Sequence, residues 1–577
     1  MKPLKQSIRI DRNVEMEMRD GTILRADIYR PEGHEKYPAI LIRTPYGKHA
    51  FNGGFLNPVE AALAGFAIII QDIRGRFASQ GQWDRQNMFE VEALDGYDSV
   101  EWIAAQSWSN GSVGMAGGSY LAALTWIAAM ARPPHLKAIS PWIGDIGTHM
   151  QPFPHSGVIN FYTAANAIPL TALDLLDKLE QSGEDVQNIR AYIEHVLEHP
   201  EEVIHHLPLK EIPLAKYEPI KKMWLARLNP LPAQEQDKYR KYELVNVPAL
   251  HVGGWFDQLE WATIRNYQQM VERGGSPYAR DHQYLLMGPW MHGAPVNYLG
   301  EMGFGSAVGG RGIDIHQKIL SFFVKHLCDI EITIPSVRYF VMGENKWKEA
   351  DHWPLPDTQW QHFYLHSGGR ANTAQGDGKL SREMPGSQPP DTFIYDPFDP
   401  VPTLGGRVVP SPGLVPGPFD QSSIEMRNDV LCYTSDVLQE DLEVSGPVVL
   451  KLYASTSAVD TDFTAKLVDV QPNGRALNIA EGIQRASFRE WNGSKSPVKP
   501  GEIYLFTIYL GNTSYLFRRG HRIRLEVSSS NFPLYDRNMN TGNPIGEDAV
   551  GQKAEQTIYH DGKFASHLVL PVIPRQR

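Results

Sequence analysis

Hydrophobic positions over the first 142 residues switch repeatedly between two spacings, and this predicts alternating strands and helices. Short runs of consecutive apolar residues, such as 39–42, are typical of strands buried on both faces of a parallel sheet. In chain order we predict strands at 24–29, 39–42, 66–70, 111–116 and 136–139, with helices at 88–105 and 120–130. This order indicates a parallel sheet covered by helices.

The alternation stops between residues 143 and 243, where 170–180 and 186–199 have helical spacing and no strand stands out. It resumes with predicted strands at 248–252 and 284–287 and a helix at 315–326. We therefore expect one α/β domain, formed by 1–142 and 244–350, that is interrupted by a helical cap over 143–243.

The composition and the hydrophobic pattern of the chain change again after residue 350. Residues 367–425 are rich in glycine, proline, serine and aspartate, and short Val/Leu/Tyr-rich runs follow from 430 to the end. Such runs, separated by turn residues, predict an all-β sandwich or jelly roll over 351–577. The total of 577 residues, at roughly 150 residues per domain, accommodates these three units.

Composition and charge exclude several functions. The net charge of -11 argues against a nucleic-acid partner, which would normally select a basic excess. The only two cysteines, Cys328 and Cys432, exclude a disulfide framework and a cysteine zinc site. No apolar run is long enough to span a bilayer, and the first residues lack the apolar core of a secretory signal. We expect a cytoplasmic protein without a membrane partner.

A Gly117-Gly118-Ser119-Tyr120-Leu121 segment lies between a predicted buried strand and a predicted helix. This is the context of a nucleophile elbow, which exposes a serine at the top of the sheet and turns the backbone N–H of the next residue toward a developing oxyanion. Leu121 stands where the motif usually has its second glycine. On motif alone, a glycine turn with a helix-capping serine is the competing interpretation; the flanking strand and helix favour the elbow.

Two further residues complete a Ser…Asp…His order at the ends of predicted strands. Asp257 follows the strand at 248–252, and His292 follows the strand at 284–287. A serine needs a base to accept its proton and an acid to orient that base. The competing bases are His282, His251, His149 and His49, and Asp257 has an alternative role in capping the helix that starts near residue 259.

The loop after the strand at 39–42 contains Tyr46. This loop normally supplies a second donor to the oxyanion, and a tyrosine hydroxyl is suited to that role. The alternative is an aromatic ring that packs on the turn.

Taken together, these motifs resemble the bacterial cocaine esterase group, which is related to the X-Pro dipeptidyl peptidases and the α-amino acid ester hydrolases. The resemblance covers essentially the whole chain. The similar segments are residues 18–22, 71–81, 114–121, 253–257, 288–292, 458–467 and 528–533.

The resemblance implies an α/β-hydrolase domain with a helical cap insertion plus a C-terminal all-β jelly roll. It also implies Ser119 as the nucleophile, Asp257 as the acid and His292 as the base. Tyr46 matches the family tyrosine whose hydroxyl joins the Tyr120 amide in the oxyanion hole. No metal or organic cofactor is implied.

Departures from the family pattern fall in the substrate pocket, which we expect Trp255, Leu259, Val408 and Val409 to line. Leu259 stands where cocaine esterase has an acyl-pocket phenylalanine, and the segment from Val408 to Pro410 replaces a Leu-Leu-Phe run. Benzoyl recognition is therefore not implied.

The acidic cluster with which α-amino acid ester hydrolases hold an ammonium group is only half present. Its positions match Leu259 and Glu260, and its first acid falls at His149 or Met150. The extra N-terminal domain of the X-Pro peptidases is missing as well.

The sequence thus predicts a serine carboxylic-ester hydrolase for a small-molecule ester. Two alternatives are an acylase or aminopeptidase-like amide hydrolase, and a non-catalytic protein whose jelly roll binds a ligand. The natural ester and the oligomeric state stay open, and a homodimer is compatible with the sequence.

Overall fold

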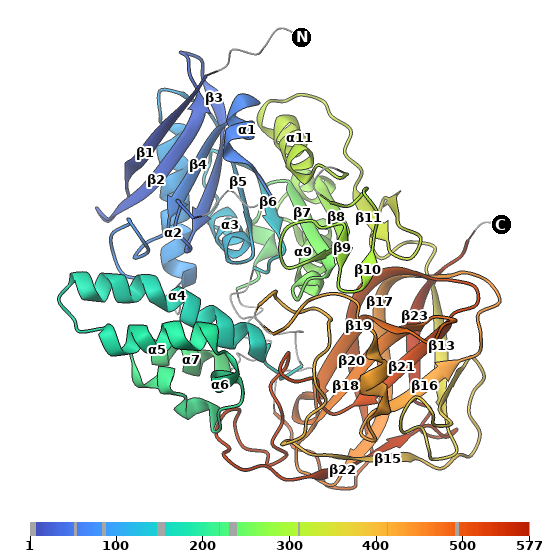
Figure 1. Cartoon of the computed structure of the whole chain (residues 1–577). Helices are drawn as coiled ribbons and strands as arrows, with labels where there is room; N and C mark the ends of the chain where they lie inside the picture. Colours follow the sequence, from blue (N-terminus) through green and yellow to red (C-terminus); the bar gives the residue numbers. More distant parts are fainter. Residues whose placement is uncertain are drawn as a thin grey trace.

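Two large sheets organise the chain in this computed structural model, and a group of helices lies beside both of them (Figure 1). The structure describes residues 7–50, 55–83, 88–146, 156–218, 220–229, 239–309, 312–411, 413–490 and 495–575. Within these residues the first sheet has ten strands and the second has eleven, and β9 (Tyr298–Leu299) and β10 (Met302–Gly303) form a separate short pair.

The first sheet has the strand order β1-β2-β4-β3-β5-β6-β7-β8-β11-β12. From β4 to β11 all neighbours are parallel, and the remaining pairs at both edges are antiparallel. The strands are β1 (Ile8–Glu17), β2 (Ile23–Pro31), β3 (Tyr37–Thr44), β4 (Ala67–Asp72), β5 (Ser109–Gly118), β6 (Leu136–Trp142), β7 (Ala249–Phe256), β8 (Gln283–Met291), β11 (Val337–Val341) and β12 (Lys346–Ala350).

Helices cover both faces of this sheet, as the continuous apolar strands predict. Side chains alternate between faces along a strand, so Ile40 and Ile42 of β3 enter one core while Leu41 enters the other. The first core includes residues of α1 and α11, the second includes residues of α2 and α10, and α3 contributes to both. These helices, with α9 beside β7, are α1 (Pro58–Leu63), α2 (Met88–Ala104), α3 (Tyr120–Met130), α9 (Glu260–Arg273), α10 (Pro277–Asp281) and α11 (Ile315–Leu327).

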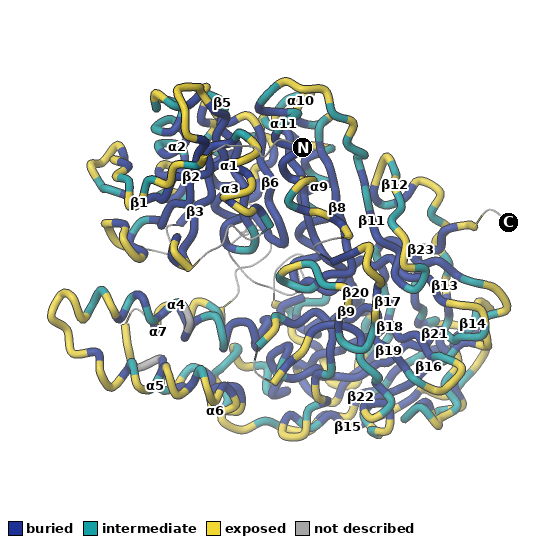
Figure 2. Tube along the Cα trace, turned by 45° about the horizontal axis from the view of Figure 1, so that its top comes forward, coloured by how far each residue is buried: buried dark blue, intermediate teal, exposed yellow. Residues whose placement is uncertain are grey.

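The predicted cap is helical in its described part. It contains α4 (Phe161–Gln181), α5 (Gln187–Glu198), α6 (Glu201–Ile204) and α7 (Ile220–Leu228), with 3-10 turns at Leu209–Glu211 and Pro213–Lys216. Its core is shared with the C-terminal domain, because Phe532 and Leu534 pack into the same cluster as Trp224. The outer surface of these helices is exposed (Figure 2), and α4 also contacts the α/β domain through Thr171 and Asp174.

The second sheet forms the C-terminal domain and has the order β15-β22-β17-β23-β13-β14-β16-β21-β18-β19, with β20 paired to β17. One hydrophobic cluster joins it to the first domain, since Trp255 and Phe340 pack with residues such as Leu450. Its strands are β13 (Gln359–His366), β14 (Lys379–Ser381), β15 (Asp391–Tyr395), β16 (Leu431–Ser435), β17 (Leu442–Thr456), β18 (Asp462–Val470), β19 (Ala476–Arg485), β20 (Tyr504–Phe517), β21 (Arg522–Ser528), β22 (Ala554–Tyr559) and β23 (His567–Ile573).

The fold class predicted from the sequence is confirmed, and the differences are local. The strands predicted from the hydrophobic pattern do not include β1 at one edge of the first sheet or β11 and β12 at the other edge. The stretch 367–425, which is rich in turn-forming residues, contains β14, β15 and most of a 3-10 helix at Gln421–Met426. These ranges support the division that we propose: an α/β domain of 1–142 and 244–350, a cap of 143–243 and a β domain of 351–577.

Candidate active site

Ser119 lies on a sharp turn between β5 and α3. Its backbone has φ 58° and ψ -121°, a conformation that L-residues rarely adopt. Tyr120 is the first residue of α3, so the positive end of the helix faces the serine. The elbow predicted from the strand–turn–helix context is therefore present, and the side chain of Ser119 is partly exposed.

Glycines allow this turn to form against a tightly packed helix. A Cβ on Gly117 would lie 2.5 Å from the Cβ of Leu121, and a Cβ on Gly144 would lie 2.4 Å from that of Ala122. Leu121 occupies the position of the usual second glycine because Gly117 leaves room for its side chain. The imperfect motif is thus compatible with an intact elbow.

The sheet brings His292 and Asp257 to the same edge as Ser119. Strands β5 to β8 are consecutive and parallel, so their carboxyl ends meet where open α/β sheets place their sites. Nε2 of His292 lies 2.9 Å from Oγ of Ser119, and Nδ1 lies 2.8 Å from Oδ1 of Asp257. Since an ionised carboxylate only accepts, Nδ1–H donates to Asp257 and the serine hydroxyl donates to Nε2.

Asp257 is wholly buried at the end of β7. Its Oδ1 also accepts the backbone N–H of Leu259 at 2.9 Å, just before α9 begins. One oxygen thus contacts both His292 and the residue before α9, whereas the helix itself has no side-chain cap. This double contact holds the carboxylate in a single orientation.

Tyr46 lies beside Tyr120 at the same edge. Their rings meet edge to face with centroids 6.4 Å apart, and Tyr46 is 40% exposed. The Tyr46 N–H donates to Oγ1 of Thr44 at 3.0 Å, and Nε1–H of Trp83 donates to the Tyr120 hydroxyl at 3.3 Å. The tyrosine is thus next to the elbow, as the family resemblance implied.

Three of the competing histidines have other partners. His251 is buried inside β7, where Nε2 faces Gln283, and burial lowers the pKa of His251 to about 4. His282 bonds the Tyr278 carbonyl, and His49 lies exposed beside Asp27. His149 is outside the described residues.

The four residues expected to line the substrate pocket differ in how far they are buried and in what they contact. Leu259 packs with Trp261 directly after the Asp257 turn, and Val409 is partly exposed. Val408 is buried in the core shared by the cap and the C-terminal domain. For Trp255 the expectation is wrong, since its ring is fully buried against Trp353 and Nε1–H donates to the Phe340 carbonyl.

Sequence reasoning missed Arg407, a buried residue of the C-terminal domain that reaches the catalytic edge. Its guanidinium donates to four backbone carbonyls and lies 3.8 Å from a carboxylate oxygen of Glu260. The carbonyls belong to Trp255 (3.0 Å), Glu481 (3.2 Å), Leu510 (2.7 Å) and Asn512 (2.9 Å). No local signal marks a single arginine in a Gly-rich loop, so its role depends on how the domains pack.

Glu260 is buried in the first turn of α9, between Asp257 and Arg407. Burial raises the pKa of Glu260 to about 7, while Arg407 and the N–H of Asn512, at 3.0 Å, act in the opposite direction. The carboxyl therefore changes charge near neutral pH inside the domain interface.

We expect that the wild-type protein loses stability as the pH rises, because Glu260 becomes charged, and that Glu260→Gln removes this loss. The pKa of Glu260 rises from 4.5 in the unfolded chain to about 7 when folded, so the folded state binds more protons between these values. Its stabilising contribution is complete below about pH 4.5 and is lost as pH rises through about 7. The variant should match the wild type at pH 4 and exceed it at pH 8 by roughly 3 kcal/mol in free energy of unfolding.

Denaturant unfolding at several pH values measures this difference. Glu272→Gln, an exposed change on the same helix, is the matched control and should follow the wild type at every pH. Parallel wild-type and Glu260→Gln profiles between pH 5 and 8 would contradict the assignment.

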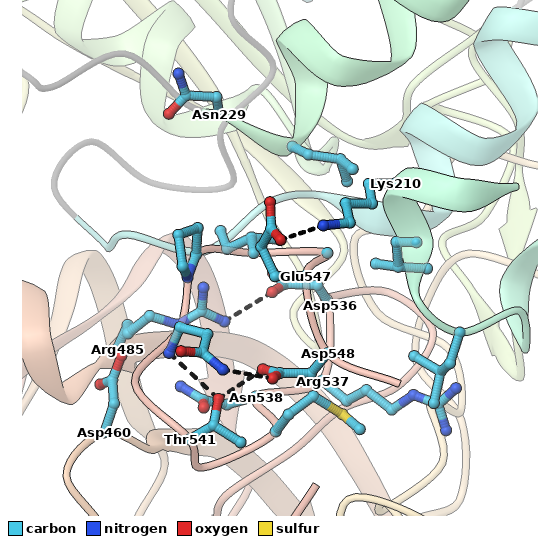
Figure 3. Close-up of a pocket in the computed structure, with 18 of the residues that line it drawn as sticks. Lys210, Asn229, Asp460, Arg485, Asp536, Arg537, Asn538, Thr541, Glu547 and Asp548 are labelled. Carbon is cyan, nitrogen blue, oxygen red and sulfur yellow. Dashed lines mark hydrogen bonds and ion pairs between the residues drawn. The ribbon is translucent and has the colours of Figure 1, made fainter. Parts of the chain in front are cut away.

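A separate cavity of about 780 Å³ lies between the cap and the C-terminal domain (Figure 3). Two ion pairs lie in its lining, Lys210 with Glu547, and Arg485 with Asp536 at 2.7 Å. No triad residue lines it. The reaction chemistry therefore lies at the strand ends and not in this cavity.

A partly exposed serine on a strand–helix turn, hydrogen-bonded to a histidine that an aspartate orients, defines a serine hydrolase of the α/β-hydrolase fold. Residues 20–294 match the model of the X-Pro dipeptidyl-peptidase (S15) family, and residues 332–569 match that of the X-Pro dipeptidyl-peptidase C-terminal non-catalytic domain. The chain belongs to the S15 family of hydrolases, in its cocaine esterase-like group.

Individual relatives extend over the full length. The chain is 36% identical to the cocaine esterase of Rhodococcus sp. (strain MB1 Bresler), covering 98% of both chains. An α-amino acid ester hydrolase structure is 25% identical with a TM-score of 0.71, covering 99% of this chain and 98% of the other. An aminopeptidase from a marine sediment Thaumarchaeota archaeon shares the fold, with 24% identity, a TM-score of 0.75 and coverage of 99% and 96%.

In the part of the chain that the structure describes, every helix is too short or too polar to cross a membrane.

Proposed function

We propose that this hydrolase is a serine esterase that cleaves carboxylic esters through an acyl-enzyme. The observation that carries the proposal is the continuous hydrogen-bond chain from Ser119 through His292 to Asp257. The full-length similarity to a cocaine esterase supports an ester as the substrate.

In the first step, Oγ of Ser119 attacks the ester carbonyl carbon while His292 Nε2 takes the hydroxyl proton. The carbonyl electron pair moves onto oxygen, where the Tyr46 hydroxyl and the Tyr120 N–H donate to it. Asp257 stabilises the imidazolium that forms. Collapse of the intermediate breaks the bond to the leaving alkoxide, which takes the proton from His292, and an acyl-serine remains.

In the second step, water gives its proton to His292 and attacks the acyl-serine from the side that the alcohol has left. The same two donors stabilise the second oxyanion. Its collapse releases the carboxylic acid and returns the proton to Ser119. The cycle balances with water as the only co-reactant.

The surroundings of the triad support a substrate without a free α-amine. Two family positions for the acidic cluster carry Leu259, which is apolar, and Glu260, which is turned to Arg407 and the Asn512 N–H. The nearby acid Asp145 is buried and paired with Arg240 at 2.7 Å. These described acids are engaged by protein groups, which disfavours the acylase and aminopeptidase-like alternatives.

Kinetics on paired substrates test the ester assignment. We expect kcat/KM for 4-nitrophenyl acetate to exceed that for 4-nitroacetanilide by at least about 10²-fold. Phenylglycine methyl ester and phenylacetic methyl ester, which differ in the free amine, should differ by less than about 10-fold. The matched leaving groups isolate the ester bond, and the matched acids isolate the amine.

Two results would contradict the proposal. A preference for amides that carry a free α-amine would favour the acylase or aminopeptidase-like alternative. Failure of a fluorophosphonate to add mass to the protein, together with no ester hydrolysis, would favour the ligand-binding alternative.

A further inference from the structure

Arg76 connects the cap to the loop that carries Tyr46. It lies in the turn after β4, and only 1% of its surface is exposed. Its Nε–H donates to the carbonyl of Pro45 at 3.1 Å, and Nη1–H donates to the carbonyl of Thr171 in α4 at 3.0 Å. One side chain thus holds the residue before Tyr46 and a turn of the cap helix.

A second contact with α4 fixes the guanidinium. Oδ2 of Asp174 lies 3.3 Å from Nε of Arg76, and the same carboxylate accepts the N–H of Phe77 at 3.1 Å. Asp174 is itself buried. The cap therefore supplies the counter-charge, and α4 runs beside the α/β domain in both views (Figure 1, Figure 2).

Two aromatic rings also lie near the guanidinium group of Arg76. The guanidinium carbon lies 4.7 Å from the ring centre of Trp83 and 5.6 Å from that of Phe77. Trp83 in turn donates to the hydroxyl of Tyr120. Arg76 therefore contacts the residue before Tyr46 directly and is linked to Tyr120, the other residue that we assign to the oxyanion hole, through Trp83.

The Tyr46 loop is held at two points. On one side, Asp72 accepts the backbone N–H of Lys48 at 2.7 Å and pairs with its ammonium at 2.9 Å, all within the α/β domain. On the other side, Arg76 holds the loop through the carbonyl of Pro45. Unlike Asp72 and Lys48, Arg76 also contacts the cap, through the carbonyl of Thr171. Burying an arginine is costly unless its donors are satisfied, and burial does lower the pKa of Arg76. A rigid fork of donors suits this task better than lysine.

We propose that Arg76 is a positioning residue for the reaction: it fixes the Pro45 carbonyl and thereby the Tyr46 hydroxyl, and Asp174 makes this position depend on a seated cap. The proposal rests on the oxyanion role of Tyr46. It predicts that Arg76 acts on kcat through Tyr46 and has little effect on KM.

A double-mutant cycle between Arg76→Gln and Tyr46→Phe tests this coupling. With 4-nitrophenyl acetate, Tyr46→Phe should lower kcat by about 10²- to 10³-fold, the effect of losing one oxyanion donor. Arg76→Gln should lower kcat by about 10- to 100-fold in the wild-type background, since a donor displaced by about 1 Å loses most of its effect. In the Tyr46→Phe background, Arg76→Gln should change kcat by less than about 2-fold.

Asp174→Asn is a milder second variant that keeps an acceptor for the Phe77 N–H and removes the charge. It should lower kcat by about 3- to 10-fold only when Tyr46 is present. Arg190→Gln is the matched control, because Arg190 pairs with Asp177 and Glu180 inside the cap. It should leave kcat unchanged.

The outcomes distinguish the positioning role of Arg76 from the oxyanion role of Tyr46 on which it rests. An equal loss from Arg76→Gln in both backgrounds, or a loss confined to KM, would overturn the positioning role while leaving the oxyanion assignment intact. A normal kcat for Tyr46→Phe would overturn both. If Arg76→Gln does not fold, Asp174→Asn decides by the same criteria.

Discussion

Ser119→Ala should abolish ester hydrolysis, with kcat falling by up to about 10⁶-fold toward the residual rate supplied by the oxyanion hole and binding alone. The reason is geometric: among the described groups at this edge, the Ser119 hydroxyl is the one hydrogen-bonded to Nε2 of His292. A fluorophosphonate should add mass to the wild type and leave the variant unmodified. Steady-state hydrolysis of 4-nitrophenyl acetate and intact-mass spectrometry measure the two effects.

The control is Ser182→Ala, which removes an exposed hydroxyl at the end of α4. It should retain full activity and the adduct. A Ser119→Ala enzyme that keeps more than about a hundredth of the wild-type kcat would contradict the nucleophile assignment, because it exceeds what binding and oxyanion contacts provide.

Asp257→Asn should lower kcat by about 10²- to 10³-fold. This loss is smaller than the loss of about 10⁴-fold that is expected when the amide group imposes the wrong tautomer on the catalytic histidine. Oδ1 of Asp257 accepts both the His292 Nδ1–H and the Leu259 N–H. An asparagine oxygen in that place keeps both bonds, whereas an NH₂ group there would face the Leu259 N–H. The tautomer is therefore preserved, and the loss measures the missing charge beside the imidazolium.

The comparison with Asp257→Ala isolates this effect. Alanine removes the acceptor as well as the charge, so we expect a larger loss of kcat than for asparagine. Asp281→Asn, an exposed change in α10, should have no effect. Equal kcat values for Asp257→Asn and Asp257→Ala would show that the retained Oδ1 contacts do not matter.

The order and placement of the candidate triad were predictable from the sequence. Each member follows a short apolar run, and parallel strands with helical connections bring such strand ends to one edge. Ser119 required one more signal, the flanking strand and helix, because its glycine motif is incomplete at Leu121. The structure explains that departure through the space left by Gly117.

Other features of the site were not predictable. Trp255 lies two positions before Asp257, yet its ring packs against Trp353 in the core between the domains. Arg407 contacts the end of β7 from about 150 residues away in the chain. No spacing or propensity encodes such contacts, since they depend on how two separately patterned domains dock.

The sequence by itself determined the alternation of strands and helices, the helical cap, the strand-rich final section and the strand-end positions of Ser119, Asp257 and His292. These follow from short-range physics, because periods of 2 and about 3.6 residues decide which side chains share a face. Only the tertiary structure decided that Arg76 joins Pro45 to α4 and that Arg407 and Glu260 meet behind Asp257. A buried charge must find its partners wherever the packed elements place them, and that placement belongs to the whole fold.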